Sequence, residues 1–407
     1  MTPPYHHAAD GFAQDSVPDP VENARALRPW LADRAAQTER EGRISADATS
    51  RLIAGGLTKV GQPARFGGQG GTPGEIFRIG FELGQACPST AWCMMIANGL
   101  AWLIAYWPIA AQRDVWGDNP DAVVGGTFVP TGKCEATDGG FLVSGAWPFA
   151  SNCDNTDWFF VAAMLPDVDG APAGPGWFLV PRADLTIDAD SWSVAGMQGT
   201  GSKTLIARDP VFVPAHRALR FMDVVRGTTP GRVLPDNVQA GFNFATIGGV
   251  VLVAPLLGAA QAALDWFATA MRTKVKTSLR PGAPASVADG PDAQLCAGQA
   301  QARIEAALAL LTSKIAAFEA KVLAGEDPSP DDRIGMRRAI AFAAQQARDV
   351  VGDVFAAAGA SGAAQGQPIQ RLWRDVTVGA NHASLDIPAI YRMSGQHLFG
   401  LVPMGAH

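Results

Sequence analysis

The sequence predicts a multidomain α+β protein, in which a helical domain and a four-helix bundle flank a central antiparallel β-sandwich or barrel. The chain of 407 residues is longer than one compact core usually serves. Short strand-like runs gather in its middle third, and long alanine-rich runs follow them. We therefore divide the chain into a flexible N-terminal arm (1–20), a helical domain (21–121), a β domain (122–235) and a four-helix bundle (236–407).

Four helices are predicted in the first domain, because each has a recognisable start. Asp19 and Ser45 are capping residues before helical segments, and residues 72–75 have the spacing of a capping box. A further helix covers residues 88–105, which begin with proline. The arm before them has neither a basic n-region nor an apolar h-region, so we do not expect a signal peptide.

The other two domains are predicted from contrasting patterns. Runs of β-branched and aromatic residues, separated by glycine, proline and aspartate, predict strands at 122–129, 141–147, 158–162, 177–180 and 203–207. Long helical runs joined by short loops favour an up-down bundle. These runs cover residues 245–275, 291–324, 331–358 and 368–398.

Composition excludes several classes of function. The net charge of −6 provides no basic field for nucleic acid. The five cysteines form no CxxC pair and have no histidine pair nearby, so we expect reduced thiols in a cytoplasmic protein. His6 and His7 lack a third ligand, and we predict no metal site.

Two uncharged stretches, residues 83–112 and 237–264, are long enough to cross a bilayer. Both contain proline, and neither has flanks rich in lysine or arginine. We expect buried core helices and no membrane partner; two membrane spans are the alternative.

Familiar nucleotide-binding and catalytic motifs do not fit. Residues 196–204 resemble a phosphate-binding loop, but Ser202 stands where the lysine is required and the segment leads into a strand. No dinucleotide-binding GxGxxG, zinc-binding HExxH or GxSxG elbow stands out. Cys153 has no histidine near it in sequence, which favours a packed thiol over a nucleophile.

Four segments carry a resemblance to one superfamily. They are ACPSTAW at 86–92, SGAWPFASNCD at 144–154, WSVAGMQGTGSKT at 192–204 with VFVP at 211–214, and Arg374-Asp375 followed by His382. In this order they resemble the acyl-CoA dehydrogenase fold. Within it they are similar to the two-component flavin-dependent monooxygenases that include 4-hydroxyphenylacetate, steroid-phenol and dibenzothiophene oxygenases. The resemblance covers roughly residues 25–400.

This resemblance implies an enzyme that receives reduced flavin, FADH2 or FMNH2, from a separate flavin reductase. With O2 it would form a C4a-(hydro)peroxyflavin and hydroxylate an aromatic or polycyclic small molecule, as a homotetramer. N-oxygenation of an amine or amino sugar stays open, as does desaturation by an enzyme that keeps FAD bound. A binding protein that has lost flavin is the non-enzymatic alternative.

The resemblance also assigns residues to the flavin. Ser151 is expected near flavin N5, with Phe149 and Ala150 covering the ring and Trp147 beside them; a polar turn after an edge strand is the alternative. Flavin oxygenases need a dry pocket with a few fixed donors, which suits this segment.

Two groups of residues resemble the family's flavin-phosphate contacts. Thr200 and Ser202 are the first group, and an ordinary glycine-rich β-turn is the alternative. Arg272, Lys274 and Lys276 follow the first bundle helix, where a basic cluster reaches a neighbouring subunit's flavin; a solvated helix end is the alternative.

His382 is the main catalytic candidate. In the related oxygenases a histidine at this place approaches the flavin and the substrate, where it would donate a hydrogen bond to the peroxide or take a proton from a phenol. The alternative is a core histidine in the last helix. We expect Arg374 and Asp375 to form a structural ion pair.

The substrate pocket is expected between the ACPSTAW helix and the final helices. Acyl-CoA dehydrogenases in the most familiar branch carry a glutamate on the final helix, but residues 380–383 read ANHA. Many of the related oxygenases carry a histidine a few residues before a tryptophan in the helix after ACPSTAW, but residues 98–102 read NGLAW. Leu100 cannot form a hydrogen bond, which leaves open a substrate or reaction that differs from that of the phenol hydroxylases. The expected lining is Trp92, Asn98, Leu100, Trp102 and Met197.

Overall fold

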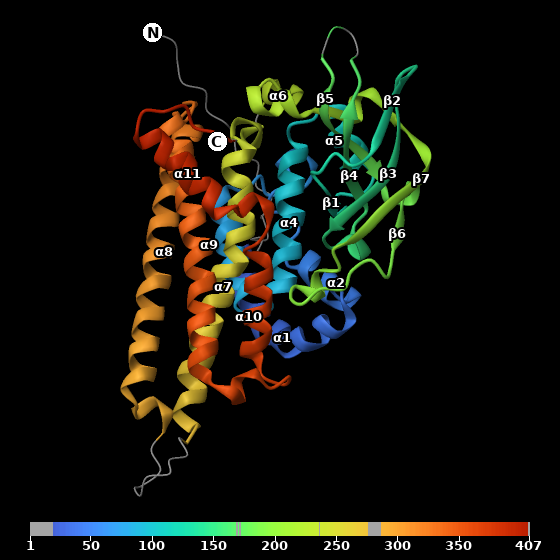
Figure 1. The fold of residues 1–407 in the computed structure, drawn as a ribbon. Coiled ribbons are helices and arrows are strands. Elements are labelled where there is room, and N and C mark those ends of the chain that lie inside the picture. Colours follow the sequence, from blue (N-terminus) through green and yellow to red (C-terminus); the bar gives the residue numbers. More distant parts are fainter. Residues whose placement is uncertain (1–18, 168–169, 171, 236, 276–285, 406–407) are drawn as a thin grey trace, which may run out of the picture.

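The computed structural model describes residues 19–167, 170, 172–235, 237–275 and 286–405. Figure 1 shows a bundle of long helices on one side, the β-strands on the other, and α4 (Pro88–Ile104) between them. Most of the predicted N-terminal arm, with His6 and His7, and also Lys276, lie outside the described residues.

The N-terminal helices begin where the sequence predicts. Asp19 and Ser45 accept hydrogen bonds from the first turns of their helices, and Thr72 and Glu75 form the predicted capping box. A fifth helix, α5, follows Pro108 and was not predicted. The remaining helices of this domain are α1 (Pro20–Glu41), α2 (Ala46–Ala54), α3 (Pro73–Gly84) and α5 (Ile109–Trp116).

The β domain is a sandwich of two four-stranded sheets. Every predicted run contains a strand, although the run at 122–129 is paired only over three residues. The first sheet has the order β1 (Val124–Gly126), β4 (Trp158–Leu165), β5 (Gly174–Pro181), β8 (Ala218–Arg220). The second has the order β2 (Lys133–Thr137), β3 (Gly140–Ala150), β7 (Lys203–Pro214), β6 (Thr186–Asp188).

One strand pair departs from the antiparallel arrangement that the sequence predicts. The short strand β1 pairs in parallel with β4, because the chain leaves β1 and returns through the β2–β3 hairpin before it enters β4. The other strand pairs are antiparallel.

Three of the four predicted bundle helices are confirmed, and a short helix α6 precedes them. The fourth, expected at 368–398, is wrong as one helix because the chain breaks at residues 380–386. His382 has an extended backbone there, and Pro388 cannot donate the hydrogen bond that a continuous helix would need. The helices are α6 (Phe221–Arg226), α7 (Phe244–Thr273), α8 (Pro291–Leu323), α9 (Pro330–Ala358), α10 (Pro368–Gly379) and α11 (Ile387–Leu398).

Helix α7 joins the helical domains into one core. It packs against α3 and α4 on one side and against α9 and α10 on the other. Among the described residues it is the one helix long and apolar enough to cross a membrane, but 82% of its most apolar window is buried inside the protein. This burial supports the expected core helix over a membrane span.

Candidate active site

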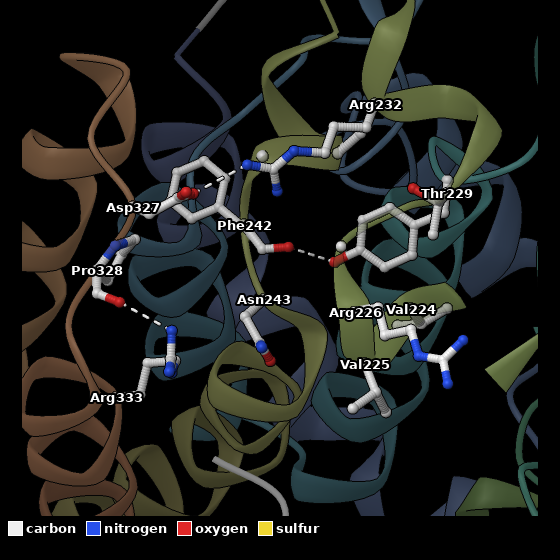
Figure 2. A pocket seen from close by; sticks show the side chains of 14 residues that line it. Val224, Val225, Arg226, Thr229, Arg232, Phe242, Asn243, Asp327, Pro328 and Arg333 are labelled. Carbon is white, nitrogen blue, oxygen red and sulfur yellow. Dashed lines mark hydrogen bonds and ion pairs between the residues drawn. The ribbon is translucent and has the colours of Figure 1, made fainter. Parts of the chain in front are cut away.

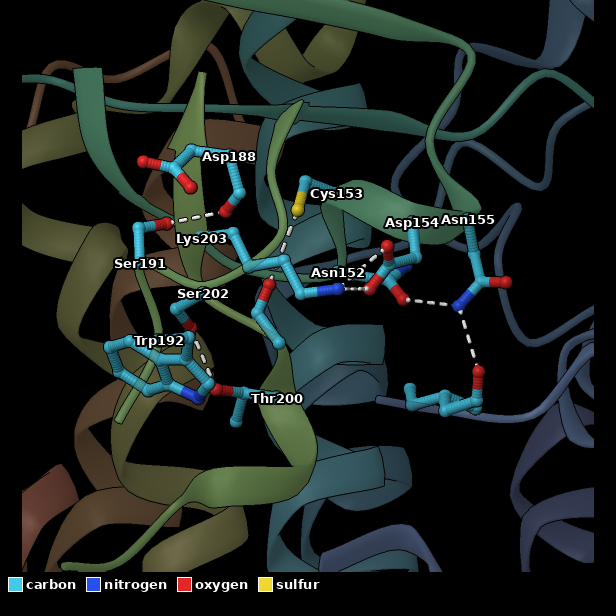
Figure 3. Close-up of polar contacts among 12 residues, drawn as sticks. Asn152, Cys153, Asp154, Asn155, Asp188, Ser191, Trp192, Thr200, Ser202 and Lys203 are labelled. Atoms are coloured by element: carbon cyan, nitrogen blue, oxygen red, sulfur yellow. Dashed lines mark hydrogen bonds and ion pairs between the residues drawn. The ribbon is translucent and has the colours of Figure 1, made fainter. Parts of the chain in front are cut away.

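A chain of hydroxyl groups connects the β domain to α4. Trp92 Nε1 lies 3.3 Å from Ser151 Oγ, and Ser151 Oγ lies 2.8 Å from Ser202 Oγ. Ser202 Oγ lies 2.7 Å from Thr200 Oγ1, which in turn donates to the Met197 carbonyl at 2.8 Å. Figure 3 shows the Thr200 and Ser202 members of this chain.

The two ends of the chain fix its direction. The indole N–H of Trp92 can only donate, the Met197 carbonyl can only accept, and each hydroxyl has one hydrogen to give. Ser151 therefore donates to Ser202, and Ser202 donates to Thr200. It follows that Ser151 Oγ has no hydrogen left for a ligand and offers a lone pair, so that it acts as a hydrogen-bond acceptor.

The backbone around this chain is strained. Phe149, Asn152 and Met197 are the non-glycine residues with positive φ among the described residues, at 66°, 61° and 58°. Such conformations are costly for L-residues and gather at functional sites. The Asn152 N–H holds the two loops together by donating to the Thr200 carbonyl at 2.9 Å.

A β-bulge turns Phe149 outward. The register between β3 and β7 shifts between Trp147 and Ala150, and Phe149 within the bulge is 69% exposed. Its ring meets the edge of Trp192 at a centroid distance of 6.2 Å. An exposed phenyl ring next to Ser151 is suited to cover a flat ligand.

The neighbours of Phe149 point elsewhere. Ala150 is fully buried. The indole of Trp147 lies in the core between the two sheets and donates to the Ala162 carbonyl at 2.7 Å. Its side chain is thus engaged on the far side of the strand, and we do not include Trp147 in the site.

Two side chains of helix α10 form hydrogen bonds with the segment before Thr200. Asp375 is buried and accepts from the Met197 N–H at 2.5 Å. Arg374 forms an ion pair with Glu39 at 2.5 Å and donates to the Ala195 carbonyl at 2.7 Å. The expected ion pair between Arg374 and Asp375 is therefore wrong, because each side chain binds a different part of the chain.

The Asp375 carboxyl has an unusual pKa. Burial raises the pKa of Asp375 to about 6. The hydrogen bond from the Met197 N–H and the nearby positive charge of Arg371 act in the opposite direction, but burial is the larger effect. Its position next to Met197 makes Asp375 part of the support for the hydroxyl chain.

His382 lies in the break between α10 and α11. Its ring meets Trp92 edge-on at a centroid distance of 5.7 Å. The Ser384 N–H donates to His382 Nδ1 at 3.1 Å, so the proton of the neutral ring sits on Nε2. Burial lowers the pKa of His382, which favours this neutral form.

A small cavity of about 30 Å³ lies beside His382 and includes Leu100. Its walls come from α4, α7 and the chain after β1. The lining residues are Ile96, Gly99, Leu100, Phe128, Phe244, Gly248, Val251, Leu252, His382 and Ser384.

Asn98 and Trp102, which were also expected in the substrate pocket, lie outside this lining. Asn98 is fully buried; its Nδ2 donates to the carbonyls of Leu57 and Met94, and its Oδ1 accepts from the Gly61 N–H. Trp102 packs on Phe242 at a centroid distance of 5.6 Å. Both side chains are used to join α4 to its neighbours.

The predicted basic cluster is separate from this site within one chain. Arg272 is exposed at the C-terminal end of α7. Lys274 donates to the Ala358 carbonyl at the end of α9, at 2.5 Å.

A larger pocket of about 270 Å³ lies between α6, the start of α7 and the segment before α9 (Figure 2). Arg232 on its wall pairs with Asp327 at 2.9 Å, and Arg333 donates to the Pro328 carbonyl at 2.8 Å. None of the predicted site residues lines it.

The sequence did not point to three aromatic residues: Trp192, whose ring meets Phe149, and Phe128 and Phe244, which line the cavity beside His382. Trp192 begins one of the four segments that carried the resemblance, so its position in the sequence could have marked it as a candidate site residue. Phe128 and Phe244 lie in separate domains, and only the packing brings them together at 5.3 Å.

The three-part fold is that of the acyl-CoA dehydrogenases. Two family models match the chain, "Acyl-CoA dehydrogenase, N-terminal domain" over residues 23–118 and "Acyl-CoA dehydrogenase, C-terminal domain" over residues 250–387.

Named relatives narrow this class. An FADH2-dependent resorcinol hydroxylase, oxygenase component, from Rhizobium sp. (strain MTP-10005) is 36% identical, over 92% of each chain. The crystal structure of 3-HSA hydroxylase from Rhodococcus sp. RHA1 superposes with a TM-score of 0.88 at 32% identity, covering 95% of this chain and 98% of that one. XiaF from Streptomyces sp., solved with FADH2 and glycerol, has a TM-score of 0.86 at 28% identity, covering 96% and 97%.

The chain belongs to the flavin-dependent monooxygenases, as an oxygenase component with the acyl-CoA dehydrogenase fold. The predicted family, fold and enzyme class are thereby confirmed. These relatives do not support the desaturase or the flavin-free binding protein.

Proposed function

We propose that this protein hydroxylates a phenolic small molecule, using O2 and FADH2 that a separate reductase supplies. One observation carries the proposal: Trp92 contacts both Ser151, through its indole N–H, and His382, through its ring. FADH2 is preferred over FMNH2 because relatives are described with it.

The residues around Ser151 suit a reduced flavin. Reduced flavin carries a hydrogen on N5, and the lone pair of Ser151 Oγ is a matching acceptor. Phe149 would cover the ring. When bound, the flavin supplies the electrons that activate O2 for insertion into the substrate.

His382 orients the substrate. Its Nε2–H donates to the substrate's phenol oxygen, while the Ser384 N–H holds the ring in this tautomer. Because burial lowers its pKa, His382 stays a neutral donor at neutral pH.

For Thr200 and Ser202 we propose a different role from the expected flavin-phosphate contact. Their hydroxyls are buried and hydrogen-bonded to each other, and that of Ser202 is also bonded to Ser151. We propose that they orient Ser151 rather than reach a flavin phosphate. The phosphate contact falls to Arg272 and Lys274 of a neighbouring subunit in a homotetramer, and we place the enzyme in the cytoplasm.

The test is a labelled turnover experiment. Purified protein, resorcinol, FADH2 from an added reductase and ¹⁸O2 should give a product that carries one ¹⁸O atom, with less product from FMNH2. Hydrogen peroxide as the sole product, with resorcinol and other phenols alike, would overturn the proposal.

A further inference from the structure

The walls of the cavity beside His382 are almost entirely apolar. Leu100 from α4, Phe128 after β1 and Val251 from α7 surround it, and its polar members are His382 and Ser384. No lysine, arginine, aspartate or glutamate is among its lining residues within the described part of the chain. Since Leu100 cannot hydrogen-bond, His382 is left as the main polar anchor for a substrate.

This lining offers no positive charge to stabilise an anionic substrate. His382 is neutral, because its Nδ1 accepts from Ser384 N–H and burial lowers its pKa. Arg337 is half-buried, donates to the Ala245 carbonyl at 3.3 Å and is not part of the lining. A carboxylate in the cavity would lose its hydration without gaining a positive partner, which costs several kcal/mol.

Glycines determine the width of the cavity. A Cβ at Gly99 would meet Val251 Cγ1 at 3.3 Å, and a Cβ at Gly248 would meet the Phe244 ring at 3.3 Å. At about 30 Å³ the cavity has room for very few water molecules. A single ring therefore needs both glycines and an outward movement of the walls, and a fused ring system would need a larger one.

We infer that this cavity selects neutral, single-ring phenols, and that Leu100 and Gly248 set that selectivity. The inference rests on the proposed function and narrows it. The hydroxyl of such a phenol accepts from His382 Nε2–H, and its apolar ring edge lies between α4 and α7. Arylacetates and polycyclic phenols are excluded, the first by charge and the second by size.

The test compares resorcinol with 4-hydroxyphenylacetate and with a steroid phenol. Binding is followed by tryptophan fluorescence without turnover, since Trp92 contacts His382, and kcat/KM is measured in the reductase-coupled assay. Resorcinol should exceed each of the other two by at least 100-fold in kcat/KM and bind correspondingly more tightly. A difference below tenfold for either competitor would overturn the inference, whereas hydroxylation of none of the three would count against the proposed function.

Variants assign the selectivity to residues. Gly248→Val should weaken resorcinol binding at least tenfold and leave flavin binding unchanged. Gly298→Val is the matched control and should bind resorcinol normally, because a Cβ at Gly298 in α8 would meet no atom within 4 Å. Equal resorcinol binding by Gly248→Val and wild type would overturn the role of Gly248.

Leu100→Arg adds the positive charge that the cavity lacks and so tests whether charge excludes an anionic substrate. It should raise kcat/KM for 4-hydroxyphenylacetate relative to resorcinol by at least tenfold. Leu100→Gln, which is closer to leucine in size and neutral, should not. If Leu100→Arg fails to fold, the double variant Leu100→Gln/Val251→Ala tests whether the cavity excludes 4-hydroxyphenylacetate by its charge. This variant should still prefer resorcinol over 4-hydroxyphenylacetate in kcat/KM. Loss of that preference would overturn the charge argument.

Discussion

At the residue scale, the hydroxyl chain turns a serine that could donate or accept into one that only accepts. The Trp92 N–H and the Met197 carbonyl impose this direction from the two ends. Members of a directed chain also strengthen one another. The acceptor character of Ser151 thus depends on partners as distant as the Met197 carbonyl.

Removing the middle hydroxyl of this chain should uncouple O2 consumption from hydroxylation of the substrate. Ser202→Ala leaves Ser151 and Thr200 without their shared partner, so Ser151 is free to rotate and to donate. We expect at least tenfold more H2O2 per product and a loss of about 1–2 kcal/mol in the free energy of unfolding. Ser191→Ala, on the surface, is the control; normal coupling in Ser202→Ala would contradict the proposed direction.

His382→Ala should separate hydroxylation from flavin binding. We expect product formation to fall at least 100-fold, because the substrate's phenol oxygen loses its donor. The dissociation constant for flavin should change less than threefold. A parallel loss of flavin binding would assign His382 to structure instead.

Asp375 should make the stability of the protein depend on pH. Its folded pKa of about 6 lies above the ordinary value near 4, so the folded state binds the proton more tightly and stability falls as pH rises from 4 to 6. Asp375→Asn keeps an acceptor for the Met197 N–H but has no charge to bury. Its stability relative to wild type should therefore rise by about 1 kcal/mol between pH 5 and pH 7.

Urea unfolding of both proteins at the two pH values measures this change. Asp118→Asn, at an exposed position, is the control and should show no such difference. Parallel pH dependences of wild type and Asp375→Asn would mean that the Asp375 carboxyl is not buried in its charged form.

At the scale of elements, the site depends on an interruption in a helix. The break between α10 and α11 brings His382 toward Trp92, with the backbone turned out of the helical conformation. A continuous helix would carry the side chain along a helix face instead. The Asp386 side chain begins α11 by accepting from the Ala389 N–H at 3.0 Å.

Asp386→Ala should loosen this break without touching the site. Loss of the helix cap is expected to cost about 1 kcal/mol in the free energy of unfolding. The KM for the phenol should rise because Ser384 and His382 are held less firmly. Asn381→Ala, exposed in the same segment, provides the comparison, and an unchanged KM in Asp386→Ala would show that the break is stiff without its cap.

Local signals in the sequence predicted most elements. Capping residues at Asp19, Ser45 and Thr72 mark real helix starts because they satisfy N–H groups within a few residues. The break at 380–386 was missed, since an apolar pattern continues across it and Pro388 also fits the first turn of a new helix.

The site was only partly predictable. His382 and Ser151 were predicted by resemblance, and the fold brings each into contact with Trp92; their roles stay predictions. The direction of the hydroxyl chain and the partner of Asp375 were not predictable, because they depend on contacts between residues up to 178 positions apart. Such contacts follow from packing and not from local pattern.

At the scale of the whole molecule, no single domain contains the site. Ser151 and Thr200 come from the β domain, Trp92 from the first helical domain, and Asp375 and His382 from the bundle. The apolar core runs without interruption from the N-terminal helices into the bundle. The packing of these three parts of the chain against one another therefore brings the candidate site residues together.

The central place of α7 has a consequence for how the chain is made. Its partner α3 has already left the ribosome when α7 emerges, but α9 and α10 follow only after α8 has been synthesised. During that interval an uncharged helical face lacks half of its covering. Nascent chains stalled between α7 and α9 should thus recruit chaperones strongly, and those stalled beyond α10 should release them.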